Sequence, residues 1–196
     1  MNNFYKILLI SILFYNCKPK EIVTFYDKNN KHVYERYSTN HLGEKNGIYY
    51  SFDFQGNLIV ESIYKKGKLD GEFKTYCRNK NIFEIRNYIL GNLNGPTLGY
   101  YCDGRIKYIV NYKNNTMVSV TKMVSKSGEN LEIGSFNNGN GILFKYDDNS
   151  NLIEKISYKK GLREGPTYLI SNTGHIDSIF FSFGKSEFSD QFIYIY

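Results

Sequence analysis

A short glycine-centred segment recurs along the chain at an almost constant interval, and this repeat limits the possible folds more than any other feature. The segment at residues 64–71 reads Tyr-Lys-Lys-Gly-Lys-Leu-Asp-Gly, and we call it and its copies joints. Counted from the second glycine of each joint, six units begin at Gly47, Gly71, Gly95, Ser119, Gly141 and Gly165, with spacings of 24, 24, 24, 22 and 24 residues. Such self-similarity is typical of solenoids and repeat arrays. The fold can therefore be predicted from one unit.

Most joints contain two glycines four residues apart, preceded by an aromatic residue. The glycine pairs are Gly43 and Gly47, Gly67 and Gly71, Gly91 and Gly95, and Gly161 and Gly165. The aromatic residues are Tyr64, Tyr88, Tyr112, Phe136 and Tyr158. Because glycine tolerates the positive φ that tight turns require, each joint is predicted to be a turn.

Each unit is predicted to be a β-hairpin. An apolar run follows the joint, then a turn rich in Gly and Asn, such as Gln55-Gly56-Asn57, and then a second apolar run. Runs of about six residues bounded by turn residues have the length of strands rather than helices. Short joints connect the hairpins, so we expect an all-β fold, an elongated single-layer antiparallel β-meander of roughly twelve strands.

Period-2 alternation along the predicted strands suggests one face rich in aromatic rings. Positions one, three and five of the first strand are more apolar than the positions between them, and the second strand has apolar residues at its ends. We therefore expect aromatic columns along a single face, which would be the candidate binding face. Its residues are Tyr50, Phe52, Tyr64, Tyr76, Tyr88, Tyr100, Tyr112, Tyr146 and Tyr158.

The first residues have the features of an export signal. Lys6 precedes an apolar run at 7–14, which is too short to cross a bilayer as a helix, and Cys17 follows closely. This arrangement resembles a bacterial lipoprotein signal, which implies a lipid on Cys17 and attachment to the cell envelope, at the outer membrane or cell surface. Phe14 and Asn16 depart from the usual pattern. An ordinary signal peptide or an uncleaved anchor is the alternative.

We divide the chain into a signal peptide at 1–16, a lipidated cysteine and tether at 17–30, and a repeat domain at 31–196. Residues 21–38 also have the form of a degenerate half unit, which would cap the open sheet edge. In unit four, Asn115 and Ser119 replace both joint glycines, and the following joint is two residues short. A kink or bulge is expected there.

The joints at 43–47, 64–71, 88–95 and 158–165, together with the hairpin turns, resemble bacterial MORN-repeat proteins. They are similar in particular to the MORN variant known as the YwqK-type antitoxin family. The resemblance extends over residues 43–184. It implies a scaffold, or a module that contacts membranes or proteins.

The residues that catalysis or metal binding would need are scattered. His32, His41 and His175 lie in three separate turn-like places, and Asp147-Asp148 falls in a hairpin turn, where acidic residues serve the backbone. Asp70, Asn94 and Glu164 directly precede joint glycines and are likewise assigned to turn geometry. We therefore expect no enzyme activity, no metal and no cofactor.

Two further cysteines, Cys77 and Cys102, occupy nearly equivalent places in consecutive units. Equivalent places are two strands apart, about 9–10 Å at the usual strand spacing, which is too far for a disulfide. We expect two free thiols.

The net charge of +6 is concentrated at the joints. The candidate basic edge consists of Lys65, Lys66, Lys68, Lys159, Lys160 and Arg163. These cations could contact anionic lipid headgroups or an acidic partner, although a solubilising rim that protects the sheet edge is the interpretation we favour. Export argues against nucleic acid as a partner.

The leading hypothesis is a non-catalytic lipoprotein, anchored to the membrane through Cys17, whose repeat sheet binds a protein or an envelope polymer. The alternatives are an antitoxin- or immunity-like inhibitor of one toxin, a lipid-headgroup module, and an envelope hydrolase. The hydrolase would need carboxylates clustered on one face.

Overall fold

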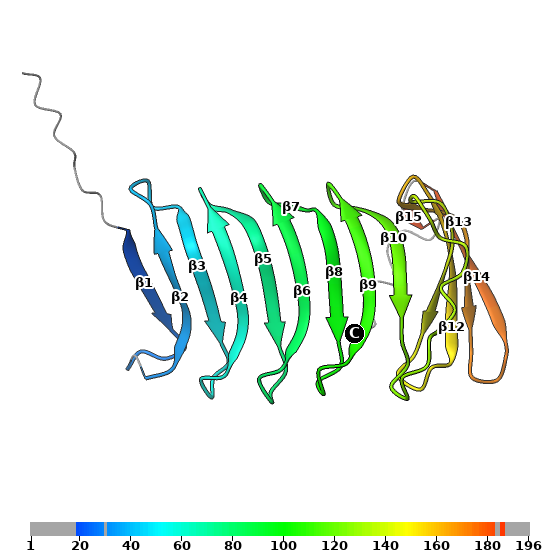
Figure 1. The fold of residues 1–196 in the computed structure, drawn as a ribbon, viewed down its shortest axis with the longest axis horizontal. Helices are drawn as coiled ribbons and strands as arrows, with labels where there is room; N and C mark the ends of the chain where they lie inside the picture. The colour runs from blue at the N-terminus through cyan, green and yellow to red at the C-terminus, as the bar shows by residue number, and fades with distance from the viewer. Residues whose placement is uncertain (1–18, 30, 183–184, 187–196) are drawn as a thin grey trace, which may run out of the picture.

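The computed structural model describes residues 19–29, 31–182 and 185–186, and these residues form an all-β meander. The predicted fold class is confirmed, with antiparallel strands that follow one another in chain order (Figure 1). They form two sheets. The first contains β1 (Lys20–Phe25), β2 (Val33–Thr39), β3 (Lys45–Phe52), β4 (Leu58–Lys65), β5 (Lys68–Tyr76), β6 (Ile82–Ile89), β7 (Asn92–Leu93), β8 (Gly95–Tyr100), β9 (Ile106–Lys113) and β10 (Thr116–Met123). The second contains β11 (Gly141–Tyr146), β12 (Leu152–Lys159), β13 (Leu162–Ile170), β14 (Ile176–Ser182) and β15 (Lys185–Ser186).

From Lys66-Gly67 onward, each joint is a tight turn whose two central residues both have positive φ, whereas at the first joint Gly43 alone has it and Leu42 does not. Lys66 and Gly67 have φ of 49° and 75°, and Asn114 and Asn115 have 48° and 66°. Two consecutive positive φ values are the signature of the type I′ hairpin turn, whose twist matches that of the flanking strands. Asn115 can replace the joint glycine because asparagine tolerates the left-handed region better than most residues.

The joints stack on one another through backbone hydrogen bonds. Gly67 N donates to Lys45 O at 2.9 Å, and Gly91 N donates to Leu69 O at 2.7 Å, so each joint is bonded to the one before it. The residue before the second glycine adds a side-chain bond, as when Asp70 Oδ1 accepts from Leu90 N at 3.0 Å. This supports the assignment of Asp70 to turn geometry.

The predicted kink lies in unit four, where the array divides into two sheets. Residues 130–136 do not form a regular second strand. Val124 bridges Asn130 at the edge of β10, whereas Gly134 bridges Leu143 in β11, so the segment crosses from one sheet to the other. β10 itself carries two register shifts against β9. The joint stack nevertheless continues across the corner, since Gly139 N donates to Val118 O at 2.8 Å.

The apolar core gathers at this corner. Among the described residues, the buried hydrophobic side chains are Val120, Phe136 and Ile156, which are 8%, 4% and 3% exposed. Their rings and methyl groups come from β10, the crossing segment and β12. A single-layer sheet cannot bury residues of this size, so burial requires the second sheet to turn against the first.

The sheet begins earlier than predicted. β1 lies inside the stretch assigned to the tether at 17–30, and it pairs with β2 from Lys20↔Thr39 to Phe25↔Val33. The boundary at residue 30 is therefore wrong, because the β-branched and aromatic residues at 22–25 favour a strand. The half unit predicted at 21–38 matches β1 and β2. Signal residues 1–16 and Cys17 lie outside the described residues.

The prediction of one shared aromatic face is wrong. Tyr64 pairs with Gly47 and therefore lies on the same face as Tyr49, whereas Tyr50 points to the other side. The cause is a bulge beside the hairpin turns of β3–β4, β5–β6, β8–β9 and β11–β12, which the β13–β14 hairpin lacks. Ser51 pairs with Val60 but Phe52 pairs with Leu58, and the extra residue shifts the second strand by one, which reverses its faces.

From this register we name the two faces of the first sheet. The tyrosine face of the first sheet carries Tyr37, Tyr49, Tyr64, Phe73, Tyr88 and Tyr112. The opposite face carries Tyr50, Phe52, Tyr76 and Tyr100. In the second sheet, Tyr158 pairs with Gly141, and Tyr146 lies on the other side.

The expectation of free thiols is also wrong, because Cys77 and Cys102 form a disulfide with Cα atoms 5.8 Å apart. The spacing argument applies inside strands, but both cysteines lie in the turns that follow β5 and β8. Cys102 sits in a turn that contacts the turn of the preceding unit, where Asn79 and Asn81 side chains donate to Cys102 O at 2.6 and 2.7 Å. The strand order is the predicted one. Turns in a stack can thus approach more closely than the strands they connect.

Candidate functional site

A cluster of stacked rings occupies the tyrosine face of β2 to β4. The ring centroids of Tyr37 and Tyr49 are 6.1 Å apart, and those of Tyr49 and Tyr64 are 5.7 Å apart. Lys45 Nζ lies 4.4 Å and 4.2 Å from the Tyr37 and Tyr49 centroids and 3.4 Å from Glu35 Oε2. The rings are half-buried, so their remaining surface faces solvent. The cation–π contacts hold the cluster in one arrangement.

The pKa of Tyr49 reflects this packing. Burial, followed by a hydrogen bond to Glu35, raises the pKa of its phenol to about 12. The Tyr49 phenol therefore stays neutral across the physiological range, and the positive charge beside it belongs to Lys45, which Glu35 balances.

The tyrosine face continues along β5 and β6 with an edge-to-face pair. Phe73 and Tyr88 have centroids 6.1 Å apart, and Arg86 lies 5.9 Å from the Phe73 centroid. The second sheet stands at the β10 end of the array, so this N-terminal half of the face is left open (Figure 1). It offers rigid aromatic surface of the kind that is enriched at protein interfaces.

On the opposite face of the first sheet, polar side chains lie between the aromatic rings. Tyr76 Oη donates to Glu61 Oε2 at 3.2 Å, and Tyr50 contacts Phe52 with centroids 6.5 Å apart. Tyr146, in the second sheet, donates its hydroxyl to Glu132 O at 2.9 Å. These rings were predicted to join one binding surface with the joint tyrosines, and the register separates them.

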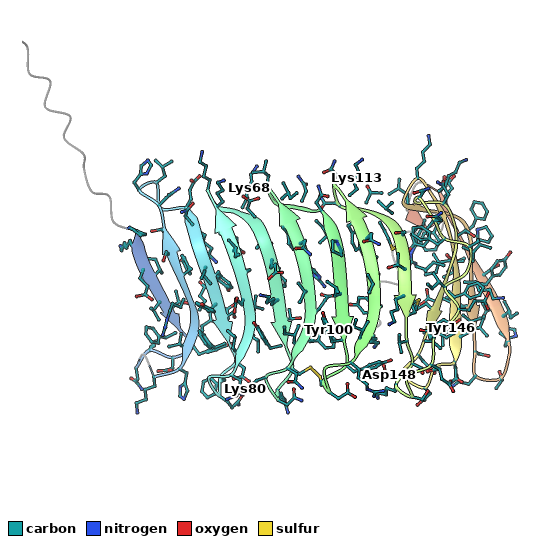
Figure 2. The ribbon with its side chains drawn as sticks, viewed as in Figure 1. Lys68, Lys80, Tyr100, Lys113, Tyr146 and Asp148 are labelled. Carbon is teal, nitrogen blue, oxygen red and sulfur yellow. A yellow bond between two sulfur atoms is a disulfide. The ribbon has the colours of Figure 1, made fainter. Side chains whose placement is uncertain are left out.

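The predicted basic residues lie at the joint edge of the array. Figure 2 shows Lys68 and Lys113 along this edge, with Lys80 and Asp148 along the hairpin edge. Lys65 and Lys68 form a register pair beside the first joint turn and are exposed. The remaining cations of this edge belong to two joints of the array, at Lys66, Lys159, Lys160 and Arg163. Arg163 differs from the lysines, because it also lines the space between the sheets.

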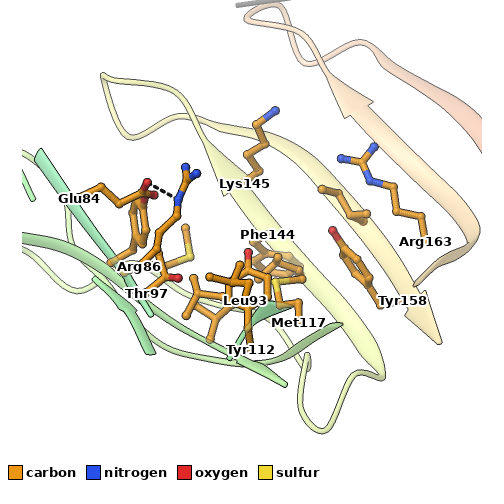
Figure 3. A pocket seen from close by; sticks show the side chains of 16 residues that line it. Glu84, Arg86, Leu93, Thr97, Tyr112, Met117, Phe144, Lys145, Tyr158 and Arg163 are labelled. Atoms are coloured by element: carbon orange, nitrogen blue, oxygen red, sulfur yellow. Dashed lines mark hydrogen bonds and ion pairs between the residues drawn. The ribbon is translucent and has the colours of Figure 1, made fainter. Parts of the chain in front are cut away.

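That space is a cleft of about 500 Å³, and it was not predicted from the sequence. β6 to β10 form one wall and β11 to β13 the other (Figure 3). Its apolar lining includes Met117, Met123, Leu143, Phe144 and Ile156. The cleft exists because residues 130–136 carry the chain from one sheet to the other. The lost joint glycines of unit four are the sequence signal for the corner, but they do not indicate a cavity.

A polar group lies at the first-sheet end of the cleft. Glu84 is only 7% exposed and accepts a hydrogen bond from Tyr108 Oη at 2.5 Å. Arg86 Nε lies 2.6 Å from its second oxygen. Burial, and then the bond to Glu84, raises the pKa of the Tyr108 phenol above its ordinary value. Both carboxylate oxygens are thus partnered, and Thr97 Oγ1 nearby is buried with no partner among the described residues.

The remaining candidates for chemistry serve turns. Asp147 Oδ1 accepts from the backbone N of Asn149 and Asn151 at 2.9 and 2.8 Å, and the side chain of Asn151 chiefly lowers the pKa of its carboxyl. His32 Nδ1 lies 2.8 Å from Asp27 Oδ2, and His175 Nε2 lies 3.2 Å from Asp177 Oδ1. In the described part of the chain, no group of three His, Cys, Asp or Glu residues is placed to hold a metal ion. No described helix has the length and apolar character needed to cross a bilayer.

Comparison with known families identifies one region. Residues 139–160, from the joint at Gly139 to the residue after β12, match the model of the MORN repeat variant. This region is unit five of the array, which has the same turns as the other units. No curated protein matches the chain.

Proposed function

We propose that this MORN-repeat chain is a non-catalytic binding module that presents the tyrosine face of its first sheet to a protein or an envelope polymer. The observation that carries the proposal is the ring cluster of Tyr37, Tyr49 and Tyr64, half-buried and held by Lys45. Partly exposed aromatic rings with fixed positions give much contact area at little entropic cost. The face extends over several strands, which suits an extended partner.

Export and membrane attachment are part of the same proposal. The disulfide between Cys77 and Cys102 supports them, because disulfides persist mainly in oxidising compartments outside the cytoplasm. Lipidation of Cys17 would tether the module to the envelope close to β1. Mass spectrometry of the protein from its native host tests this step. A diacylated or triacylated N-terminal Cys17 is expected, and an intact Met1 would contradict it.

Neighbouring residues of β3 provide a matched test of the binding face. Tyr49 and Tyr50 point to opposite faces of the same strand. A photo-crosslinking amino acid placed at position 49 or 73 is expected to give a reproducible adduct in host cells, whereas the same amino acid at position 50 is expected to give none. Equal adducts from 49 and 50 would contradict a one-faced binding module.

The identity of the adduct separates the alternatives. A single toxic protein, together with toxin sensitivity after deletion of the gene, would favour the inhibitor role implied by the antitoxin resemblance. An envelope protein or polymer would favour the platform. Membrane association that survives Cys17→Ser and is lost when the joint lysines Lys65, Lys66 and Lys68 are also replaced by Gln would favour the lipid-headgroup alternative instead.

A further inference from the structure

The cleft between the two sheets has the size and lining of a small-molecule site. A volume of about 500 Å³ lies within the range of roughly 300–1,000 Å³ that is usual for ligand pockets. Its apolar lining includes two methionines, Met117 and Met123, both from β10. Flexible thioether side chains adapt to hydrocarbon ligands of different shape. The cleft lies apart from Tyr37, Tyr49 and Tyr64, so the inference does not depend on the function proposed for that cluster.

The charged groups of the cleft are gathered on one side of it. Figure 3 shows the charged ends of Arg86, Lys145 and Arg163 extending to the same side of the pocket, away from Leu93 and Met117. Three cations and one carboxylate, Glu84, line the cleft, which leaves an excess of positive charge.

The three cations are not equally available to a ligand. Arg86 is bonded to Glu84, and Lys145 Nζ lies 2.5 Å from Glu154 Oε1. Arg163 instead stacks on Phe181, 5.3 Å from the ring centroid, and no carboxylate pairs with it among the described residues. An arginine fixed on an aromatic ring keeps its donors free for an anion, and a bidentate pair with a carboxylate is among the strongest charged contacts.

From this arrangement we infer that the cleft binds a monomeric amphipathic anion. Its hydrocarbon body lies against Met117, Met123 and Phe144, and its acidic head is bound by Arg163 with the Tyr158 hydroxyl beside it. The apolar lining and the cations are on different sides of one cavity. A purely polar anion would leave the apolar lining without contacts, and an uncharged hydrocarbon would leave Arg163 without a partner for its charge.

Laurate and dodecanol are the matched probes, since they share a twelve-carbon chain and differ in the charge of the head. Calorimetric titration of the mature chain is expected to give one laurate site, with dodecanol bound at least tenfold more weakly. Arg163→Gln is expected to weaken laurate binding about tenfold or more, while Lys68→Gln, at the exposed joint edge, leaves it unchanged. Equal affinity for both probes, or equal effects of the two substitutions, would overturn the inference.

Location is tested separately by methyl NMR. Laurate is expected to shift the Met117 and Met123 methyl signals in the wild type at concentrations below its micelle range. This readout also shows whether Arg163→Gln still folds, because its unliganded methyl signals should match those of the wild type. Binding to anionic vesicles without any methyl shift would assign the anion site to a membrane surface and contradict the cleft.

A segment of the chain itself could be the occupant instead. Residues 191–196 read Gln-Phe-Ile-Tyr-Ile-Tyr. A chain truncated after Ser186 is expected to bind laurate with unchanged affinity. If truncation instead raises the laurate affinity tenfold or more, this segment fills the cleft, and the inference of a small-molecule ligand is wrong.

Discussion

β4 and residues 130–136 occupy the same place in their units, yet they have different roles. β4 is hydrogen-bonded along its length to β3 on one side and to β5 on the other. Residues 130–136 make one bridge to the edge of β10 and another to β11. β4 therefore extends a sheet, whereas residues 130–136 end the first sheet and lead into the second. A repeat array can therefore turn a corner by losing one regular strand while its joints continue to stack.

Gly134 explains much of this difference. It has φ of +87° and lies where β4 has Ser62, which is fully buried in a regular strand. A Cβ at Gly134 would stand 2.3 Å from Ile142 O, so only glycine allows β11 to approach. A glycine inside a strand often marks a bulge or a close backbone approach. The corner, its core and the cleft all follow from this crossing.

The largest expected effect is at the corner core. Phe136→Ala removes a side chain that is 4% exposed and contacts Tyr158 with ring centroids 5.0 Å apart. We expect the free energy of unfolding to fall by about 3–5 kcal/mol, as measured by denaturant titration. Phe83→Ala, at a ring that is 47% exposed in β6, is the control and should cost less than about 1 kcal/mol. Similar losses in both variants would mean that the corner is not the core.

The disulfide joins two turns of the regular first sheet, and its removal tests whether this sheet unfolds separately from the second. Replacing Cys77 and Cys102 by Ser opens a loop with a sequence separation of 25 residues. On a chain-entropy basis this should lower the free energy of unfolding by about 3 kcal/mol. Amide exchange should increase in β5 to β8, while the residues of β11 to β13 keep their protection. Uniform loss of protection would show that the two sheets unfold as one unit.

Gly134→Ala tests whether the segment that crosses between the sheets requires glycine at this position. The new methyl group would meet Ile142 O and the backbone would be strained at positive φ, so we expect a loss of about 2–3 kcal/mol. Gly104→Ala is the matched control, because Gly104 also has positive φ, +91°, but nothing lies within 4 Å of its Cβ position. That change should cost only about 1 kcal/mol. If both substitutions lower the free energy of unfolding by the same amount, the close approach of β11 does not determine the corner.

The smallest effect concerns Tyr108 at the cleft. Burial and Glu84 raise the pKa of its phenol above 10.0, so its hydrogen bond contributes fully below pH 10 and is lost as the pH rises through the higher folded-state pKa. Tyr108→Phe should cost about 1 kcal/mol at neutral pH, since one hydrogen bond is removed. The difference from the wild type should shrink above pH 10. A constant difference up to strongly alkaline pH would contradict the bond to Glu84.

The sequence predicts the regular array well because its turn chemistry is local. Glycine at the joints and in most hairpin turns accepts the positive φ that these tight turns need, so the period, the strand order and the joint edge can be predicted from residue types. In the hairpin turns after β5 and β11, which lack glycine, Lys80 and Ser150 take the positive φ instead. The assignment of faces fails because one bulged residue beside most hairpin turns reverses the alternation, as between β3 and β4, and the residues around Ser51 and Phe52 do not signal it. The disulfide and the cleft depend on how turns and sheets approach in space, which no spacing in the chain determines.

The central claim is that β10 and β12 face each other across a cleft instead of lying in one continuous sheet. Methyl labelling tests it directly, because the described residues contain two methionines, Met117 and Met123, and both line the cleft. We expect nuclear Overhauser contacts from these methyl groups to the rings of Phe144 or Tyr158. In a continuous sheet β10 and β12 would be three strand spacings apart, about 14 Å, and such contacts would be missing. Their absence in the folded protein would contradict the two-sheet arrangement and the cleft with it.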